Sequence, residues 1–281
     1  MHFSIIMWRF LDLDKIDGFY SAAVFEAIGS HVGAGSSPET ILFWRVRSPV
    51  VYIGYHQCVE DEINANFCRE GGIGIVRRIL GGGCGFCDDN QILFSVIGRD
   101  DGVIPNDIQE AYSKVLGGVV NALVSLGAGG EIEPARNAVY SHGRKISGNA
   151  QGRFDGAVMV NGSLLLAFDF EMMDQVLKNP TKNLRPVASA REGMVTLREL
   201  GIIDMAAVKN SLRQGFENAL GVSSYEGKLT ESENKRASVI LEKYVRNDWI
   251  YMMDNKRAMR KKNRLTELTR FSDDTLSETS L

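Results

Sequence analysis

The sequence predicts an α+β fold in which helices flank a central, mostly antiparallel or mixed β-sheet. Short runs rich in β-branched and aromatic residues alternate with segments whose apolar residues recur at helical spacing. This alternation lacks the regular strand–helix–strand order of a parallel sheet, and no internal repeat accompanies it. With 281 residues, 44% of them hydrophobic, the chain can bury a large core in one domain or in a large and a small one.

In the first half of the chain, residues 18–32 are predicted to form a helix because Phe19 and Ala23 begin an apolar face at helical spacing. The run 40–55 is rich in β-forming residues and is interrupted by Pro49, so it is predicted as two strands around a turn. The elements predicted next are a short helix over 60–70, strands over 74–78 and 91–98, and a long helix over 107–126.

The second half begins with a predicted hairpin, in which residues 136–141 and 143–146 pair around a turn at His142. Thr230 and Glu233 have the spacing of a capping box at the start of the last predicted helix. The elements predicted after the hairpin are a strand pair or one bent strand over 157–168 and helices over 170–177, 206–220 and 230–244.

The composition changes at Asn255. Six basic residues fall within residues 256–264, and a Ser/Thr-rich acidic end follows. We therefore expect one domain over residues 1–254 and a basic, polar and flexible tail over residues 255–281. The alternative is that this tail docks on an acidic partner.

The overall composition excludes several classes of partner. The formal charge of -3 provides no basic field for nucleic acid. No apolar run approaches the roughly 20 residues that span a bilayer, and the first residues lack the pattern of a secretory signal. Four cysteines at irregular positions do not form a disulfide framework, so we expect a cytoplasmic protein without nucleic-acid or membrane partners.

A glycine-rich segment between two predicted strands contains Arg77, Arg78, Gly81, Gly82 and Gly83. Glycines let the backbone turn sharply and bring N–H groups close to an anion, and arginine side chains pair with phosphate or carboxylate oxygens. The segment has neither the Walker pattern nor the Rossmann frame. It predicts an anion-binding loop, and the alternative is a hairpin with surface arginines.

Two cysteines and two acidic residues follow these glycines. Asp88 or Asp89 is a candidate ligand for a Mg²⁺ ion that arrives with a nucleotide, or it braces the loop. Cys84 and Cys87 form a C-x-x-C pair, but the other cysteines and the four histidines supply no second pair at zinc-site spacing. We expect small buried thiols here and not a zinc or redox site.

A second motif, GRKISGNA over residues 143–150, places Lys145 among small residues. Such surroundings let a ligand lie on the backbone while the ammonium group reaches a phosphate or carbonyl oxygen. Alone, the motif also fits a hairpin with an exposed lysine. Together with the glycine-rich segment it predicts a site that holds a phosphate-bearing group beside a narrow apolar slot.

The two motifs, in this order, resemble the lipoate–protein ligase A family of the biotin/lipoate A/B protein ligase superfamily. The resemblance includes FWRVRSPVVYIGYHQ, the arginine pair with its triglycine, RKISG and NGSLLL, and it extends from about Phe19 to Trp249. DDNQ and GRKISGN are most similar to an archaeal-type catalytic domain without the C-terminal accessory domain. The resemblance implies a fold like that of class II aminoacyl-tRNA synthetases and biotin ligases, with the catalytic domain over residues 1–254.

The resemblance also implies an activity. Lipoate or octanoate is joined to AMP from ATP, supplied with Mg²⁺ as Mg-ATP, and the acyl group then passes to a lysine of an apo lipoyl domain. Such domains occur in 2-oxoacid dehydrogenase acyltransferase subunits and in the glycine cleavage H protein. A separate small protein is implied in place of the missing accessory domain, with the basic tail as an aid to its docking.

By the same resemblance, Lys145 is the catalytic residue, placed between the acyl carbonyl and the α-phosphate. The implied substrate- and ATP-binding residues are Arg77, Arg78, Gly81, Gly82, Gly83, Asp88, Gly148, Asn149, Ala150, Gly162 and Ser163.

Four positions depart from the family pattern. Cys87 and Asn161 stand where many members have histidine, Asn149 stands where many have serine, and Gln91 falls near an expected asparagine. These departures leave the exact rates and the choice between lipoate and octanoate open. The sequence also does not show which carrier protein is modified.

Three alternatives compete with the ligase. An octanoyltransferase on the same fold would move the acyl group from acyl carrier protein through a cysteine thioester, but residues 136–141 hold no cysteine, so Cys84 or Cys87 would have to serve. A biotin ligase is disfavoured because its arginine loop differs and no helix-turn-helix precedes the domain. An inactive homologue that binds lipoyl domains is favoured by the histidine replacements and opposed by the intact Lys145.

Overall fold

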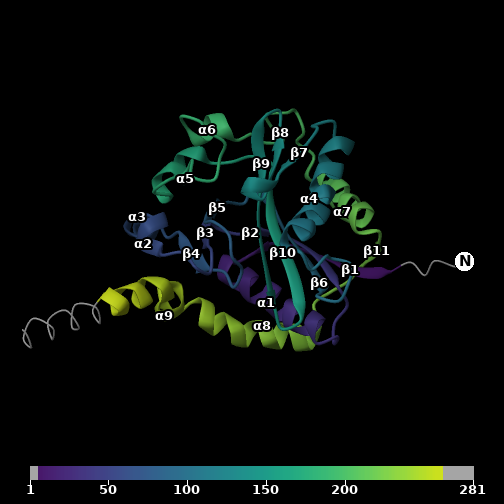
Figure 1. Ribbon diagram of the computed structural model, residues 1–281, viewed down its shortest axis with the longest axis horizontal. Helices are drawn as coiled ribbons and strands as arrows, with labels where there is room; N and C mark the ends of the chain where they lie inside the picture. Colours follow the sequence, from purple (N-terminus) through teal and green to yellow (C-terminus); the bar gives the residue numbers. More distant parts are fainter. Residues whose placement is uncertain (1–5, 262–281) are drawn as a thin grey trace, which may run out of the picture.

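The computed structural model describes residues 6–261, and helices cover both faces of a large β-sheet (Figure 1). In sheet order, the strands are β11 (Ser223–Glu226), β1 (Met7–Ile16), β2 (Thr40–Val46), β6 (Gln91–Arg99), β10 (Ala157–Leu165), β9 (Arg144–Phe154), β8 (Ala138–Ser141) and β7 (Glu131–Glu133). β1 runs parallel to β11 and β2, and the other neighbours are antiparallel. The predicted α+β class with a mostly antiparallel, mixed sheet is confirmed.

Different helices pack on the two faces of this sheet. The helices on one face are α1 (Gly18–Gly33) and α8 (Glu231–Tyr244), and those on the other are α4 (Ile108–Ser125) and α7 (Met205–Leu220). Alternate residues of β2 divide between the two cores: Leu42 and Trp44 face α1, whereas Ile41 and Phe43 face α4 and α7. Because both faces are buried, β2 and β6 are apolar over most of their length.

A second, three-stranded sheet carries the glycine-rich segment. Its strands, in sheet order, are β4 (Gly74–Arg77), β3 (Val50–Ile53) and β5 (Gly85–Cys87). A third apolar cluster packs around it and includes residues of short helices. The short helices of the chain are α2 (Val59–Glu62), α3 (Ala65–Glu70), α5 (Phe170–Val176), α6 (Ala190–Gly193) and α9 (Asn247–Ile250), with a 3-10 turn η1 (Pro134–Arg136).

Most predicted elements lie where the sequence places them, including the hairpin of β8 and β9 that turns at His142. The segment predicted as one helix over 60–70 is two helices, because Asn64 accepts the backbone N–H of Phe67 and starts α3 as a new helix. The sequence analysis did not identify β1, β5, β7, β11, α6 or α9, and except for β1 these elements are only three or four residues long.

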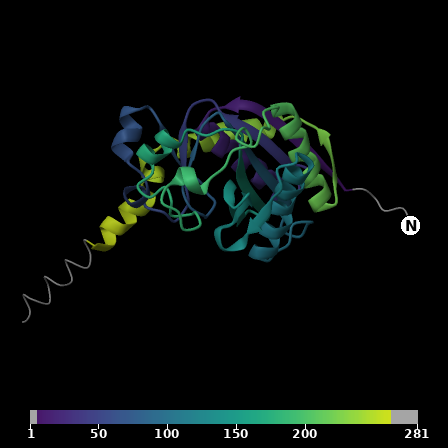
Figure 2. The same cartoon turned by 90° about the horizontal axis from the view of Figure 1, so that it is seen from above.

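A further helix follows α9. Residues 252–261 are helical, and this helix extends from the body of the protein (Figure 2). Arg257 pairs with both Glu60 and Asp61 of α2. The rest of the predicted tail, residues 262–281, lies outside the described residues. Within residues 6–261, no helix combines the length and the apolar character needed to cross a membrane.

A buried ion pair joins the sheet to α8. Arg9 of β1 donates to the two carboxylate oxygens of Glu233, at 2.8 and 2.6 Å, and both side chains are almost completely buried. Glu233 also accepts the backbone N–H of Thr230, which completes the predicted capping box. Burial alone would raise the pKa of Glu233, but the hydrogen bonds from Arg9 and Thr230 outweigh it and lower that pKa below its ordinary value.

Replacing Arg9 by methionine (Arg9→Met) is expected to lower the free energy of unfolding by about 3 kcal/mol, because Glu233 stays buried without its partner. The wild-type pair stabilises the protein above the ordinary pKa of glutamate and loses this contribution as the pH falls below it, so the variant should respond less to mild acid. Urea denaturation at neutral and acidic pH measures both effects.

The control is Arg246→Met, which removes an exposed pair with Asp248. It should cost less than about 1 kcal/mol. Equal losses of stability in the two variants would contradict the role given to the Arg9–Glu233 pair.

Candidate active site

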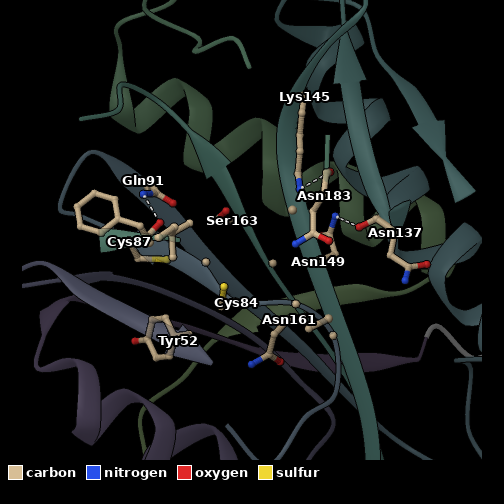
Figure 3. A pocket seen from close by; sticks show the side chains of 18 of the residues that line it. Tyr52, Cys84, Cys87, Gln91, Asn137, Lys145, Asn149, Asn161, Ser163 and Asn183 are labelled. Carbon is tan, nitrogen blue, oxygen red and sulfur yellow. Dashed lines mark hydrogen bonds between the residues drawn. The ribbon is translucent and has the colours of Figure 1, made fainter. Parts of the chain in front are cut away.

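A cavity of about 450 Å³ lies where the two sheets meet, bordered by β9, β10, the segment 179–184 and residues 79–84, which we call the glycine loop (Figure 3). Part of the lining is apolar and includes Phe25 of α1, Trp44 of β2 and Leu93 of β6, which belong to one buried cluster and mark what we call the apolar end. Charged and amide side chains line the part near β9. The cavity therefore suits a ligand with a charged head and an apolar tail.

The antiparallel pairing of β9 and β10 brings two of the sequence motifs together. The opposed pairs that line the cavity are Gly148 with Ser163, Asn149 with Gly162, and Ala150 with Asn161. A Cβ atom at Gly162 would lie 2.1 Å from Oδ1 of Asn149, so the position requires glycine. Asn149 in turn donates to the backbone oxygen of Asn137 at 3.1 Å, which fixes its side chain.

A β-bulge turns Lys145 towards the cavity. Tyr140 of β8 lies opposite Lys145, the register then shifts at Val139, and Ile146 is thereby an extra residue on β9. Without the bulge, Lys145 and Gly148 would project from opposite faces, because side chains alternate along a strand. They share a face instead, since a Cβ atom at Gly148 would lie 3.1 Å from Cε of Lys145.

The buried side chain of Arg78 shapes the glycine loop. Its Nη2 donates to the backbone oxygens of Gly81, at 3.0 Å, and Gly83, at 2.8 Å. Gly82 has a φ of +87°, which L side chains rarely adopt. A Cβ atom at Gly82 would lie 3.1 Å from that of Ala150, so the loop packs directly on β9.

The segment 179–184 connects this loop with Lys145. Nδ2 of Asn183 lies 2.6 Å from where a Cβ of Gly83 would be, and Nζ of Lys145 donates to the backbone oxygen of Asn183 at 3.5 Å (Figure 3). Lys182 of the same segment pairs with Glu62 at 2.5 Å. The lysine motif and the triglycine thus converge on one cavity, as the sequence predicts.

The cavity is cationic although the whole chain has a formal charge of -3. Its charged lining residues are Glu62 and the four cations Arg78, Arg136, Lys145 and Lys182. Burial and, to a smaller extent, the charge of Arg136 lower the pKa of Lys145 to about 8. A bound anion would favour the protonated form of Lys145 and so raise this pKa again.

The structure brings together most of the predicted site residues. Those that line the cavity are Arg78, Gly82, Gly83, Lys145, Gly148, Asn149, Ala150, Gly162 and Ser163. Their roles in binding or catalysis stay predictions, but their common location is a property of the fold.

Arg77 and Gly81 do not line the cavity, contrary to their predicted roles. The side chain of Arg77 is fully buried and lies 3.8 Å from the carboxylate of Asp254. Its guanidinium group donates to the backbone oxygens of Gly54, Tyr55, Gln57, Trp249 and Ile250. Arg77 therefore joins segments of the backbone, and Gly81 supplies its carbonyl to Arg78.

Asp88 and Asp89 also lie outside the cavity. Asp88 is buried and accepts the backbone N–H groups of Asn90 and Asp169, and Asp89 pairs with Lys15 at 2.6 Å. Among the described residues, no group of three or more His, Cys, Asp or Glu side chains could hold a metal ion. In this structure the two carboxylates brace the chain, which is the alternative that the sequence offered, and a role as Mg²⁺ ligand stays a prediction.

Several residues that line the cavity were not predicted from the sequence. They are Phe25, Trp44, Tyr52, Leu93, Glu62, Arg136, Asn137, Lys182 and Asn183. Alternation along residues 40–46 indicates that Leu42 and Trp44 share a face, but no local pattern indicates that this face borders a cavity.

The geometry agrees with the comparison to known proteins. A family model described as "Lipoyl protein ligase A/B catalytic domain" matches residues 17–217. The chain belongs to this family.

Curated relatives in the lipoyl protein ligase A/B family are named octanoyltransferases. Octanoyltransferase LipM of Symbiobacterium thermophilum is 32% identical over 268 residues, which cover 86% of this chain and 97% of the relative. Octanoyltransferase LipM of Moorella thermoacetica is 29% identical over 266 residues, with the same coverage of each chain.

Similar solved structures are named ligases. A lipoate-protein ligase A bound with ATP has a TM-score of 0.77 at 27% identity, covering 88% of this chain and 99% of that one. A bi-partite lipoate protein ligase from Thermoplasma acidophilum, described with its E2 lipoyl domain, has a TM-score of 0.78 at 26% identity, covering 88% and 97%. The predicted family is confirmed, and the chain is an enzyme of this ligase and octanoyltransferase group.

The amine of Lys145 is expected to titrate near pH 8 in the ligand-free protein, far below the ordinary lysine value of 10.5. Arg136→Gln should raise the midpoint, because removal of a nearby positive charge favours the protonated amine. NMR of the reductively ¹³C-methylated protein measures the titration, and Lys145→Arg assigns the signal. A wild-type midpoint above about 10 would contradict the desolvated position of this lysine.

Proposed function

We propose that this chain is an ATP-dependent lipoate–protein ligase. It activates lipoate or octanoate as acyl-AMP and transfers the acyl group to a lysine of a lipoyl domain. The observation that carries the proposal is the cationic cavity in which Lys145 and the glycine loop lie beside an apolar end. An acyl-adenylate has the matching parts, namely an anionic phosphate and an eight-carbon tail.

The charges in the cavity favour a nucleotide triphosphate. Glu62 is already paired with Lys182, which leaves a positive potential from Arg78, Arg136 and Lys145. A cleft lined by one sign of charge attracts ligands of the opposite sign. A thioester donor would bring a neutral acyl group to the same place, and this group would gain less electrostatic stabilisation from the three cations.

The proposed reaction has two steps. A carboxylate oxygen of the acid attacks the α-phosphorus of ATP and pyrophosphate leaves. The lysine amine of the lipoyl domain then attacks the acyl carbon, loses a proton, and AMP leaves. Negative charge develops on phosphoryl oxygens in the first step and on the acyl oxygen in the second. In this proposal the ammonium of Lys145, held by the β-bulge, stabilises that charge in both steps without moving.

The acyl tail is proposed to occupy the apolar end of the cavity. Phe25 of α1 lines this end together with Trp44 and Leu93, which are buried on the face of the sheet that α1 covers. Each methylene group that leaves water there contributes about 0.8 kcal/mol to binding. Burial of an eight-carbon chain therefore provides binding energy that holds the carboxylate of the acid beside Lys145.

Octanoyl transfer through a cysteine is the second candidate function. The names of the curated relatives favour it, and so does the position of Cys84 in the same cavity. Against it, burial and then the charge of Glu62 raise the pKa of Cys84 to about 11. Burial raises that of Cys87 to about 12. Both thiols therefore stay protonated near neutral pH, whereas the thiolate is the nucleophile.

The proposed partners are a lipoyl domain and a separate small protein. The Thermoplasma acidophilum relative is named bi-partite and is described with an E2 lipoyl domain, and this chain covers 97% of it. These names support a lipoyl domain as acceptor and a second component for this enzyme as well. We place the reaction in the cytoplasm, where ATP is available.

Incubation of the chain with ATP, Mg²⁺, lipoate and an apo lipoyl domain is expected to add one lipoyl group to the domain, as measured by intact-protein mass spectrometry. The reaction is run with and without the second component of the Thermoplasma relative. Product should disappear when ATP is omitted. Product from an octanoyl carrier-protein thioester without ATP would establish the second candidate instead, and no product in any arm would indicate an inactive homologue.

Two variants separate the chemical routes. Lys145→Ala is expected to lower the ligation rate on the order of 10²- to 10³-fold with an unchanged melting temperature, because one preorganised charge is lost. Cys84→Ser should keep ATP-dependent ligation, since the proposed route forms no thioester. An acyl group trapped on wild-type Cys84, together with loss of activity in Cys84→Ser, would refute the ligase mechanism.

A further inference from the structure

The amide of Asn161 is a buried polar group that faces the cavity, and the proposed reaction gives it no role. Its residue is 7% exposed. The fully buried Ser95 on β6 donates a hydrogen bond of 2.6 Å to Oδ1 of Asn161. This bond holds the oxygen against β6, and Asn161 is one of the residues that line the cavity, well away from Lys145 (Figure 3). Within the described residues, the hydrogen bond from Ser95 is made to Oδ1 and none is made by Nδ2, which is not among the fully buried atoms that lack a partner and so keeps some access to the cavity.

The cross-strand register places Asn161 away from the ammonium group of Lys145. Directly opposed residues form two adjacent rows across β2, β6, β10 and β9. One row consists of Leu42, Ser95, Asn161 and Ala150. The next row consists of Trp44, Leu93, Ser163 and Gly148. Directly opposed residues project from one face, which here is the face covered by α1. Lys145 lies beside Gly148, so Asn161 belongs to the farther row, about 7 Å along the strands.

The two candidate acids differ in the atoms that they bring to this position. In the proposed pose, the carboxylate lies near Lys145 and the eight-carbon chain passes the nearer row, with Trp44 and Leu93, so that its far end reaches the row of Asn161. Lipoate ends in a ring with two sulfur atoms, which are weak hydrogen-bond acceptors. Octanoate ends in a methyl group that accepts nothing. Its binding would desolvate the NH₂ group of Asn161 and leave the group unpaired, which is unfavourable.

We propose that Asn161, oriented by Ser95, determines acyl specificity and favours a sulfur-containing tail over an all-carbon tail. A site built around a hydrogen-bond donor rejects an analogue that lacks the acceptor, whereas an apolar slot discriminates weakly between similar tails. The inference rests on the proposed function in one respect, namely that the cavity takes an eight-carbon acid.

The test measures binding of lipoate and octanoate to the full chain by isothermal titration calorimetry without ATP, so it does not depend on catalysis. The wild type should bind lipoate about tenfold more tightly than octanoate. Asn161→Leu keeps a similar side-chain size and should bring the ratio to about one, by weakening lipoate and strengthening octanoate. Ser95→Ala releases the amide and should give an intermediate ratio.

Asn218→Leu, on the exposed side of α7, is the matched control and should keep the wild-type ratio. Melting temperatures establish that each variant is folded. An unchanged ratio in Asn161→Leu, or equal weakening of both acids, would overturn the inference. If neither acid binds the wild type, the result contradicts both the inference and the proposed function. If the acids bind with the expected preference but no ATP-dependent product forms, only the proposed function falls.

Discussion

The pairing of β9 with its two neighbours is the constraint on which the whole site depends: its register with β10, and the bulge at Ile146 where it pairs with β8. Side chains alternate along a strand, so a slip of β9 by one residue against β10 would turn Lys145 to the opposite face and away from Asn161, which stays in place on β10. Close packing opposes such a slip, because a Cβ atom at Gly162 would lie 2.4 Å from the ring of Phe94. The chemistry of the site is therefore a consequence of strand register, which is set by buried packing on both faces of the sheet.

The C-terminal end of the described chain fixes two other walls of the cavity. Arg77, at the end of β4 and one residue before Arg78, donates to backbone oxygens of α9. Asp254 accepts the backbone N–H groups of Val59 and Glu60, both at 3.0 Å, and so caps the start of α2. α2 ends at Glu62, which lines the cavity. One C-terminal segment therefore fixes the positions of both the glycine loop and α2, although it belongs to neither of them.

Local patterns predicted the features that depend on neighbouring residues. The capping box of α8 is one example, because Thr230 and Glu233 need only their mutual spacing. The convergence of the lysine motif and the triglycine was predictable because both carry residues suited to an anion. The sequence did not predict that Arg78 lines the cavity whereas Arg77 is buried against the C-terminal segment. Adjacent residues in extended backbone point to opposite sides, and the sequence does not indicate which side borders the cavity. Asn183 likewise enters the site through packing of segments distant in sequence.

The source of acyl activation is the point at which the names of relatives and the chemistry of the cavity diverge. A thioester route needs the thiolate of Cys84, and with a pKa of about 11 its formation at pH 7 costs about 5 kcal/mol. Glu62, whose Oε2 lies 3.8 Å from the sulfur, contributes to that cost through its charge. In the proposed ligase reaction, activation by ATP would use Lys145 and Arg136 in the positions that they already occupy. Activation by Cys84 would require the glycine loop to carry the thiol away from Glu62, against the hydrogen bonds by which Arg78 holds that loop.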